Sequence, residues 1–322
     1  MENQSVDLKI ISMDTIQSEE IKWLWYPYIP YGKLTIVQGD PGEGKTTFAL
    51  NLAAKLPLGK NFENDNESEN REPISVIYQT AEDGLADTVK PRLEAAGADC
   101  SKILVIDESE KSLSMKEDRI EQTLEQTHAK LLILDPIQAY LGDNVDMNRA
   151  NETRNVTKKI AALAERTGCA IILIGHMNKG GGQKAAYRGI GSIDFFAIAR
   201  SVLLVARVPG QPEIRAVAQI KNNLAQEGNT VAFQMADGKF EWLGEYEISI
   251  DELLGGYSSE SKSQQAVELI KSILSSQNNV PANEIILKGK QLGISKRTLD
   301  NAKHELRVKS VKVGTSWFWS LN

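Results

Sequence analysis

Residues 39–47 read GDPGEGKTT and match the whole P-loop pattern G-x-x-x-x-G-K-[ST]. The three glycines lack the Cβ atom that would keep the backbone N–H groups from curling round an anion. An apolar run at 33–38 precedes them, and a helical pattern at 46–54 follows. Because the turn joins a strand to the positive end of a helix, it predicts a phosphate-binding loop rather than a chance Gly-rich turn.

The charged and hydroxyl residues of this loop fit a nucleoside triphosphate bound with magnesium. Lys45 is placed to reach the outer phosphates, and Thr46 is placed to ligate Mg²⁺ through its hydroxyl group. Thr47 is expected to pack at the helix N-terminus. The predicted cofactors are ATP and Mg²⁺, and the predicted phosphate-binding residues are Gly39, Asp40, Pro41, Gly42, Glu43, Gly44, Lys45, Thr46 and Thr47.

Strand-type and helix-type patterns alternate along the chain after this loop. Apolar runs occupy residues 74–79, 102–106, 130–135 and 169–176, and amphipathic helical patterns occupy residues 85–96, 116–128 and 149–167. Strands that are apolar on both faces and separated by helices indicate an α/β fold with a mainly parallel central sheet. Ligands of such sheets gather beyond the carboxyl ends of the strands, so residues far apart in sequence can meet there.

Polar residues that follow these strands can converge on the loop. Asp135 ends the run LLILD, where a carboxylate binds Mg²⁺ directly or through water. Asp107, in LVIDE, is a competitor, and Asp135 is favoured because its strand is longer and better flanked by helices. Glu82 is the candidate to orient or deprotonate the attacking water, with Asp83 in reserve. His176 could hydrogen-bond the terminal phosphate, although an ordinary strand-end histidine would look the same.

Two stretches have open interpretations. Residues 23–31, WLWYPYIPY, are rich in aromatic side chains, and packing against the core is favoured over contact with a nucleotide base. Residues 177–191, MNKGGGQKAAYRGIG, read as a Gly-rich cationic loop, in which Lys179, Lys184 and Arg188 are candidates for gripping a nucleic-acid backbone. An unstructured connector is the alternative for that loop.

Charge is unevenly distributed along the chain. From Ser261 to the end there are ten Lys or Arg against four Asp or Glu, a local charge of +6, whereas the whole chain carries −6. A basic tail on an acidic body is compatible with nucleic-acid contact, and equally with a solvated surface. Two cysteines and three histidines show no metal-ligand spacing. Without a signal sequence or an apolar run of membrane-spanning length, we expect a cytoplasmic protein with no membrane contact.

The C-terminal residues have the pattern of a separate domain. Strand patterns at 213–221, 230–235 and 239–243 indicate a meander at the sheet edge, and residues 255–264 are a linker by composition. Helical patterns at 265–274, 282–288 and 295–307 then precede a hairpin pattern at 308–321. These are the parts of a winged helix-turn-helix, whose third helix would carry Lys296, Arg297 and Lys303 into the major groove. Winged helices also dock proteins, so both kinds of partner stay open.

The motifs also resemble those of a known family. The segments WLWYPYIPYGKLTIVQGDPGEGKT, YQTAEDG, LLILDPIQAYL and IILIGHMNK have the order and spacing of the RecA-type ATPase domain of RepA-like hexameric helicases, which also occurs in phage and plasmid replication proteins. The similarity covers residues 23–243. The stretch from GISKRTLDNAKHELRVKS to WFWSL is similar to winged-helix tails attached to such ATPases. The resemblance implies Glu82 as the catalytic glutamate, Asp135 as the Walker B residue, and a homo-oligomeric hexameric ring with nucleotide at each interface.

Ring ATPases of this kind take an arginine from the neighbouring subunit to neutralise charge on the transferring phosphate. Related helicases carry Lys-x-Arg on a late strand, and the matching place here reads Lys221-Asn222-Asn223. In place of the missing arginine, Arg200 or Arg207 would serve with Lys221 assisting. Otherwise turnover is slow, and the protein works as a loader, a clamp or a recombination mediator.

The sequence therefore predicts an ATP-hydrolysing, DNA-binding protein. Residues 1–254 would form a RecA-like ATPase domain, 255–264 a linker and 265–322 a winged-helix domain. The leading hypothesis is a RepA-like hexameric replicative DNA helicase of a phage or other mobile element. It would translocate on single-stranded DNA, and its C-terminal domain would contact duplex DNA or a replication protein. The alternative is a non-translocating RecA-like ATPase for DNA annealing or recombination, or for ATP-gated regulation of replication.

Overall fold

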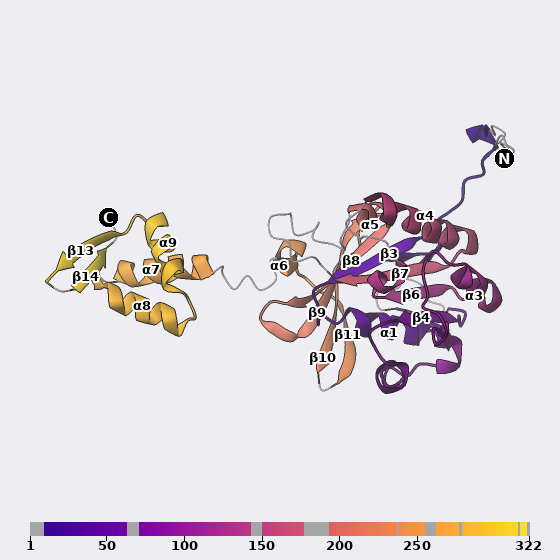
Figure 1. Cartoon of the computed structure of the whole chain (residues 1–322), viewed down its shortest axis with the longest axis horizontal. Helices are drawn as coiled ribbons and strands as arrows, with labels where there is room; N and C mark the ends of the chain where they lie inside the picture. Colours follow the sequence, from indigo (N-terminus) through magenta and orange to yellow (C-terminus); the bar gives the residue numbers. More distant parts are fainter. Residues whose placement is uncertain are drawn as a thin grey trace. The chain divides into compact units, whose positions relative to one another are not determined.

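Apolar strands lie side by side in one large sheet in the N-terminal part of the chain (Figure 1). The computed structural model describes residues 10–62, 71–142, 150–176, 193–236, 238–254, 262–276, 279–314 and 316–320. Over these residues the sheet has nine strands in the order β11-β10-β9-β8-β3-β7-β6-β4-β5. The chain divides into two units, Met1–Leu254, which contains this sheet, and Gly255–Asn322.

The central strands of the sheet are parallel, as the apolar runs predicted. They are β3 (Leu34–Gly39), β4 (Val76–Thr80), β5 (Ile103–Leu104), β6 (Leu131–Asp135), β7 (Ala170–His176) and β8 (Ser201–Val208). An antiparallel meander continues the sheet through β9 (Gln211–Asn222), β10 (Val231–Ala236) and β11 (Lys239–Glu245). The α/β fold with a mainly parallel sheet is thereby confirmed. In the pairing of β3 with β7, Gly39 lies opposite His176, so both strands end at the same level.

Helices cover both faces of the parallel strands, because side chains of each strand alternate between two apolar layers. On β3, Val37 belongs to one buried cluster, and Leu34 and Ile36 belong to the other. The first layer packs under α1 (Lys45–Lys55) and α2 (Lys90–Ala95), and the second under α3 (Arg119–Thr127), α4 (Ala150–Thr167) and α5 (Ile193–Ile198). Shorter helical segments are Met13–Thr15, Leu56–Leu58, Leu85–Val89, Cys100–Lys102, Ile137–Tyr140 and α6 (Ile250–Leu254).

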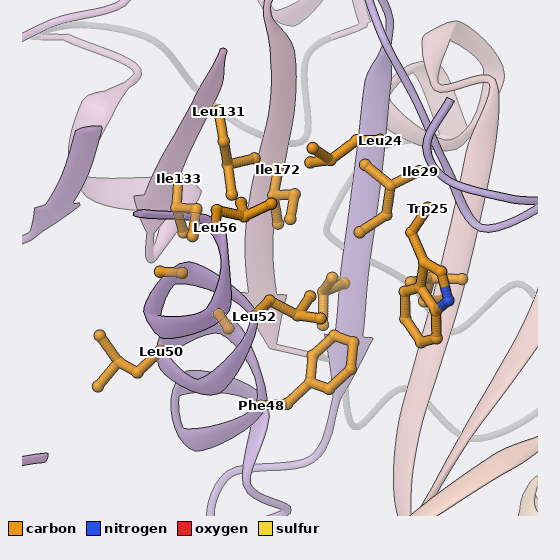
Figure 2. Packing of buried hydrophobic residues seen from close by; sticks show 14 of the residues in the cluster. Leu24, Trp25, Ile29, Phe48, Leu50, Leu52, Leu56, Leu131, Ile133 and Ile172 are labelled. Carbon is orange, nitrogen blue, oxygen red and sulfur yellow. The ribbon is translucent and has the colours of Figure 1, made fainter. Parts of the chain in front are cut away.

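The aromatic stretch at 23–31 packs into the first layer. It forms two short antiparallel strands, β1 (Trp23–Trp25) and β2 (Ile29–Pro30). Trp25 is fully buried, and its ring lies 6.3 Å from that of Phe48 on α1 and 5.9 Å from that of Trp242 on β11. Figure 2 shows Trp25, Ile29 and Phe48 in this cluster. The packing interpretation of the stretch therefore agrees with the structure.

The second unit is built from three helices and a small sheet. Its elements are α7 (Lys262–Ser276), β12 (Val280–Pro281), α8 (Ala282–Gln291), α9 (Lys296–Glu305), β13 (Lys309–Val313) and β14 (Ser316–Ser320). The strands lie in the order β12-β14-β13, and Ile285, Leu299 and Trp319 are among the side chains of the core. Ser295 caps α9 by accepting a hydrogen bond from the Thr298 N–H group. Among the described helices of the chain, none is long and apolar enough to cross a lipid bilayer.

Candidate nucleotide-binding site

The loop between β3 and α1 needs its glycines for two different reasons. Gly42 and Gly44 have φ angles of +80° and +88°, a conformation that strains residues with a Cβ atom. At Gly39 a Cβ atom would lie 2.2 Å from the Val205 carbonyl oxygen of β8. Asp40 and Pro41 are exposed, so the outer part of the loop is open to a ligand. The loop thus has the backbone form that phosphate binding requires.

Lys45 crosses the inside of this loop. Its ammonium group donates hydrogen bonds to the carbonyl oxygens of Gly39 at 3.0 Å and Asp40 at 2.9 Å. Burial lowers the pKa of Lys45, and the negative charge of Asp135 opposes that shift. A buried ammonium group that donates its hydrogen bonds to neutral carbonyl oxygens is well suited to bind an anion that enters the loop.

Thr46 and Asp135 meet although Thr46 lies on α1 and Asp135 ends β6. The Thr46 hydroxyl donates to Asp135 Oδ2 at 2.7 Å, and the Tyr78 hydroxyl donates to the same oxygen at 3.0 Å. Burial raises the pKa of Asp135, while these two hydrogen bonds oppose the shift. A hydroxyl and a carboxylate are the hard oxygen ligands that Mg²⁺ takes beside phosphate and water. No group of three or more His, Cys, Asp or Glu side chains suited to a metal occurs among the described residues.

The carboxylate of Asp107, the competitor of Asp135, is bound by a residue two positions further along the chain. The strand before Asp107 is short, since β5 ends at Leu104. The exposed Asp107 carboxylate accepts hydrogen bonds from the N–H and hydroxyl groups of Ser109 at 3.0 and 2.9 Å. The side chain of Gln79 on β4 replaces the missing strand pairing, because its amide both donates to and accepts from the backbone of Ile106. The geometry favours Asp135 as the residue beside the phosphate loop.

Glu82 and His176 lie close together beyond β4 and β7. Glu82 Oε1 is 3.9 Å from His176 Nε2, and both side chains are partly exposed. Asp83, the reserve candidate, is engaged elsewhere, because its carboxylate accepts a hydrogen bond from Arg92 at 2.9 Å. Glu82 is therefore the better placed carboxylate for activating water.

Several polar groups at the site were not identified from the sequence. Tyr78 binds Asp135 from the middle of an apolar run, and Gln38 precedes the loop within another. Within the described part of the chain, Gln38 Nε2 and His176 Nδ1 are buried and have no hydrogen-bond partner. Buried polar atoms of this kind usually find a partner, so they are consistent with a site that binds a polar ligand. Gln38 could have been identified from the sequence by its position, because it is a polar residue directly before the first glycine of the loop.

Arg207 lies beside the phosphate loop of its own chain. Its backbone N–H donates to Glu43 Oε2 at 2.5 Å, and its guanidinium group is 3.8 Å from Glu43 Oε1. This contact links the loop to the carboxyl end of β8. Glu43 thus has a structural partner that the P-loop pattern alone did not indicate.

Arg200 and Lys221 lie at the opposite end of the sheet from the loop. Arg200 immediately precedes β8, and its N–H donates to the Leu34 carbonyl at the start of β3. The Lys221 ammonium group donates to the carbonyl oxygens of Phe196 at 2.6 Å and Ala199 at 2.8 Å, and burial lowers its pKa. Neither cation meets the phosphate loop of its own chain.

The predicted DNA contacts divide into two groups. Lys179, Lys184 and Arg188 lie outside the described residues. Lys296 and Arg297 are exposed at the start of α9, and the Lys303 ammonium group lies 4.9 Å from the centre of the Trp319 ring.

The fold and this site define a P-loop nucleotide-binding domain, with a glycine loop between a parallel strand and a helix and an acidic residue at the end of a nearby strand. The chain belongs to the AAA_25 family, described as an AAA domain, whose match covers residues 4–182. That match spans the phosphate loop, Glu82, Asp135 and His176. The protein is accordingly a member of a P-loop ATPase family.

Proteins called DNA repair protein RadA are similar to this chain. The RadA of Halalkalibacterium halodurans is 28% identical over 189 residues, 57% of this chain and 37% of that protein. The RadA of Bacillus subtilis is 22% identical over 71% of this chain and 45% of its own length, and the RadA of Streptococcus pneumoniae is 24% identical over 71% and 49%. The chain thus spans less than half the length of these relatives.

One solved structure that is similar to this chain is that of a KaiC-like protein from Pyrococcus horikoshii. It shows 19% identity and a TM-score of 0.48, covering 66% of this chain and 90% of that protein.

Proposed function

We propose that this protein hydrolyses ATP and binds DNA, and that it is a RepA-like hexameric replicative helicase translocating on single-stranded DNA. The observation that carries the ATPase part is the meeting of Thr46 and Asp135 beside Lys45 at the mouth of a glycine loop. The DNA part is supported by the similarity to proteins named for DNA repair and by the basic second unit.

Each residue of the site has a specific task in this proposal. Lys45 moves from the carbonyl oxygens of its loop to the outer phosphates. Thr46 and Asp135 hold Mg²⁺, which when bound would neutralise charge that develops on the phosphates. Glu82 orients or deprotonates the attacking water, and His176, 3.9 Å away, senses whether the terminal phosphate is present.

The second unit would act as a winged helix-turn-helix. The linker predicted at 255–264 would be shorter than expected, because α7 already begins at Lys262. The unit's three helices and three-stranded sheet fit the winged-helix pattern, and α9 presents Lys296 and Arg297 to solvent. Phosphate and base contacts by such exposed cations would anchor the protein on duplex DNA.

The proposed ring needs a cation at each subunit interface. Arg200 lies at the end of the sheet away from its own phosphate loop, so it could act only on the nucleotide of a neighbouring subunit. Arg207 is the second candidate, and it would have to leave Glu43 to do so. Lys221 would assist from its position on β9.

The deciding experiment measures ATP hydrolysis with and without single-stranded DNA, using wild-type protein, Arg200→Ala, Lys45→Ala and an equimolar mixture of the two variants. Strong stimulation by DNA, lost in each variant and partly restored in the mixture, supports composite sites in a DNA motor. The ring-motor proposal would be overturned if ATP hydrolysis is weak, is not stimulated by DNA, and has the same rate in Arg200→Ala as in wild type.

A second function is favoured by one observation, the similarity to proteins named for DNA repair rather than for replication. It is a non-translocating ATPase for annealing or recombination. In that case the protein would pair complementary strands in the presence of ATP and would not displace a strand from a duplex.

A further inference from the structure

The antiparallel pair β13 and β14 exposes large apolar side chains on both of its faces. Residues opposite each other in such a pair share a face. Lys312 lies opposite Trp317 on one face, and Val311 lies opposite Phe318 on the other. Trp317, Val311 and Val313 are 53%, 50% and 61% exposed. The pair lies at one side of the three helices of the unit (Figure 1).

Core packing accounts for one aromatic residue of β14 but not for its neighbour on the same face. Trp319 is 4% exposed, belongs to the core of the unit, and lies under the Lys303 ammonium group. Trp317, two residues earlier, points to the same side of the strand but lies outside that core. Its exposed ring therefore contributes little to the stability of the unit.

The charge of the pair limits what can cover this surface. Lys309 and Lys312 are exposed on β13, Arg307 precedes them, and residues 306–320 contain no acidic side chain. β13 is also the outer strand of its sheet, with one backbone edge unpaired among the described residues. Lysines on an edge strand can simply prevent aggregation, but an exposed tryptophan beside them works against that purpose.

We propose that β13 and β14 form a stacking surface for unpaired bases, with Trp317 stacking on a base and Lys312, which lies opposite it on the same face, contacting a flanking phosphate. An exposed aromatic ring beside a cation is a combination that binds single-stranded nucleic acid, because every base has a face to stack and every linkage carries a negative charge. β13 begins after the three residues 306–308 that follow α9, so the pair would stay close to a duplex held by α9. The proposal rests on the DNA-binding function and adds a preference for junctions between duplex and single strands.

The test measures binding by full-length protein, without ATP, to three labelled probes: an oligothymidylate, a blunt duplex, and the same duplex with unpaired arms. Trp317→Ala should weaken binding to the forked duplex and the oligothymidylate about 10-fold, within the about 5- to 150-fold that stacking of one base provides. Binding to the blunt duplex should change less than about 2-fold. Trp317→Phe should keep the preference for the fork, and Leu287→Ala, which removes a 60% exposed side chain from α8, should have no effect.

Two further measurements separate the roles of the residues. Lys312→Ala should weaken binding to the oligothymidylate and the forked duplex, and should reduce the salt dependence of that binding by about one counterion. Bromodeoxyuridine in the unpaired arm should photocrosslink to Trp317 when the adducts are mapped by mass spectrometry.

The proposal would be overturned if Trp317→Ala preferred the forked duplex over the blunt duplex as strongly as wild type does. It would also be overturned if this variant lost affinity for the blunt duplex and the forked duplex equally. If Trp317→Ala without DNA differs from wild type in oligomeric state, but still distinguishes the forked duplex from the blunt duplex, then the pair contacts protein instead. If wild-type protein binds the probes but shows no preference for the fork, this inference fails and the proposed function is unaffected. If wild-type protein binds none of the probes, the DNA-binding part of the proposed function fails as well. Hydrolysis of ATP by Trp317→Ala without DNA, at the wild-type rate, shows that the first unit is intact.

Discussion

The Thr46 hydroxyl donates to the Asp135 carboxylate at 2.7 Å, and so joins residues 89 positions apart in the sequence. The contact exists because β3 and β6 are parallel strands separated only by β7, so that their carboxyl ends face the same space. The metal-binding hypothesis can be tested at this pair.

Asp135→Asn should abolish magnesium-dependent ATP hydrolysis, since the amide keeps the shape of the side chain but lacks the charge that holds a divalent cation. Asp107→Asn is the matched control and should hydrolyse ATP within about 2-fold of wild type, because the Asp107 carboxylate accepts its hydrogen bonds from Ser109, away from the phosphate loop. Steady-state hydrolysis at varied Mg²⁺ concentration distinguishes the two. The reverse result would move the metal site to the end of β5.

Lys45→Ala should reduce hydrolysis to background, because it removes the ammonium group that now occupies the inside of the loop. Lys55→Ala, at the other end of α1, should retain activity. Binding of a fluorescent ATP analogue would reveal whether the loss occurs at binding or at turnover. Full activity in Lys45→Ala would reject the site.

Glu82→Gln should bind ATP but cleave it at least about 100-fold more slowly, the usual contribution of a general base. Asp83→Asn should stay close to wild type, since Asp83 binds Arg92. Single-turnover hydrolysis with radiolabelled ATP measures both. A fast Glu82→Gln variant together with a slow Asp83→Asn variant would reverse the assignment.

Trp25→Ala should lower the free energy of unfolding by about 3–5 kcal/mol, because it leaves a large cavity among Phe48, Phe62 and Trp242. Leu243→Ala, which truncates a 39% exposed side chain, should change it by less than about 0.5 kcal/mol. Urea titration gives both values. If Trp25→Ala instead weakens nucleotide binding at unchanged stability, the aromatic stretch contacts a base.

Burial raises the pKa of the Cys169 thiol to about 12. The native thiol thus stays protonated up to high pH, whereas an unfolded thiol ionises above about 9. Its contribution to stability is therefore present below pH 9 and is lost as the pH rises towards 12. At about pH 8.5, iodoacetamide should label Cys100 in the native protein, and Cys169 only in urea. Labelling of native Cys169 at the rate of Cys100 would contradict its burial.

The sequence was informative where a pattern has a single structural solution. The glycine loop and the alternation of apolar strands with helices could both be predicted, because each depends on neighbouring residues. The strand expected at 102–106 shortens to Ile103–Leu104, since the Gln79 side chain takes the hydrogen bonds of Ile106. A bond between distant side chains of this kind leaves no periodic signal.

Side-chain contacts between strands could also not be predicted from the sequence. Tyr78 is polar only at its hydroxyl, so nothing in its apolar run distinguishes it from a core residue until β4 is placed beside β6. Likewise, the engagement of Lys221 with the carbonyl oxygens at the end of α5 depends on how β9 folds back along β8.

The glycines of the phosphate loop differ in the kind of replacement they would tolerate. At Gly42 an added Cβ atom would lie more than 4 Å from every described residue except its chain neighbours, so the obstacle to it is the sign of φ. A mirror-image amino acid introduced there by chemical synthesis would relieve that strain, because a positive φ is its ordinary conformation. At Gly39 the obstacle to an ordinary side chain is the Val205 carbonyl of the neighbouring strand, so accommodating one means moving β8. The chirality of the chain constrains the first position, and the spacing of the sheet constrains the second.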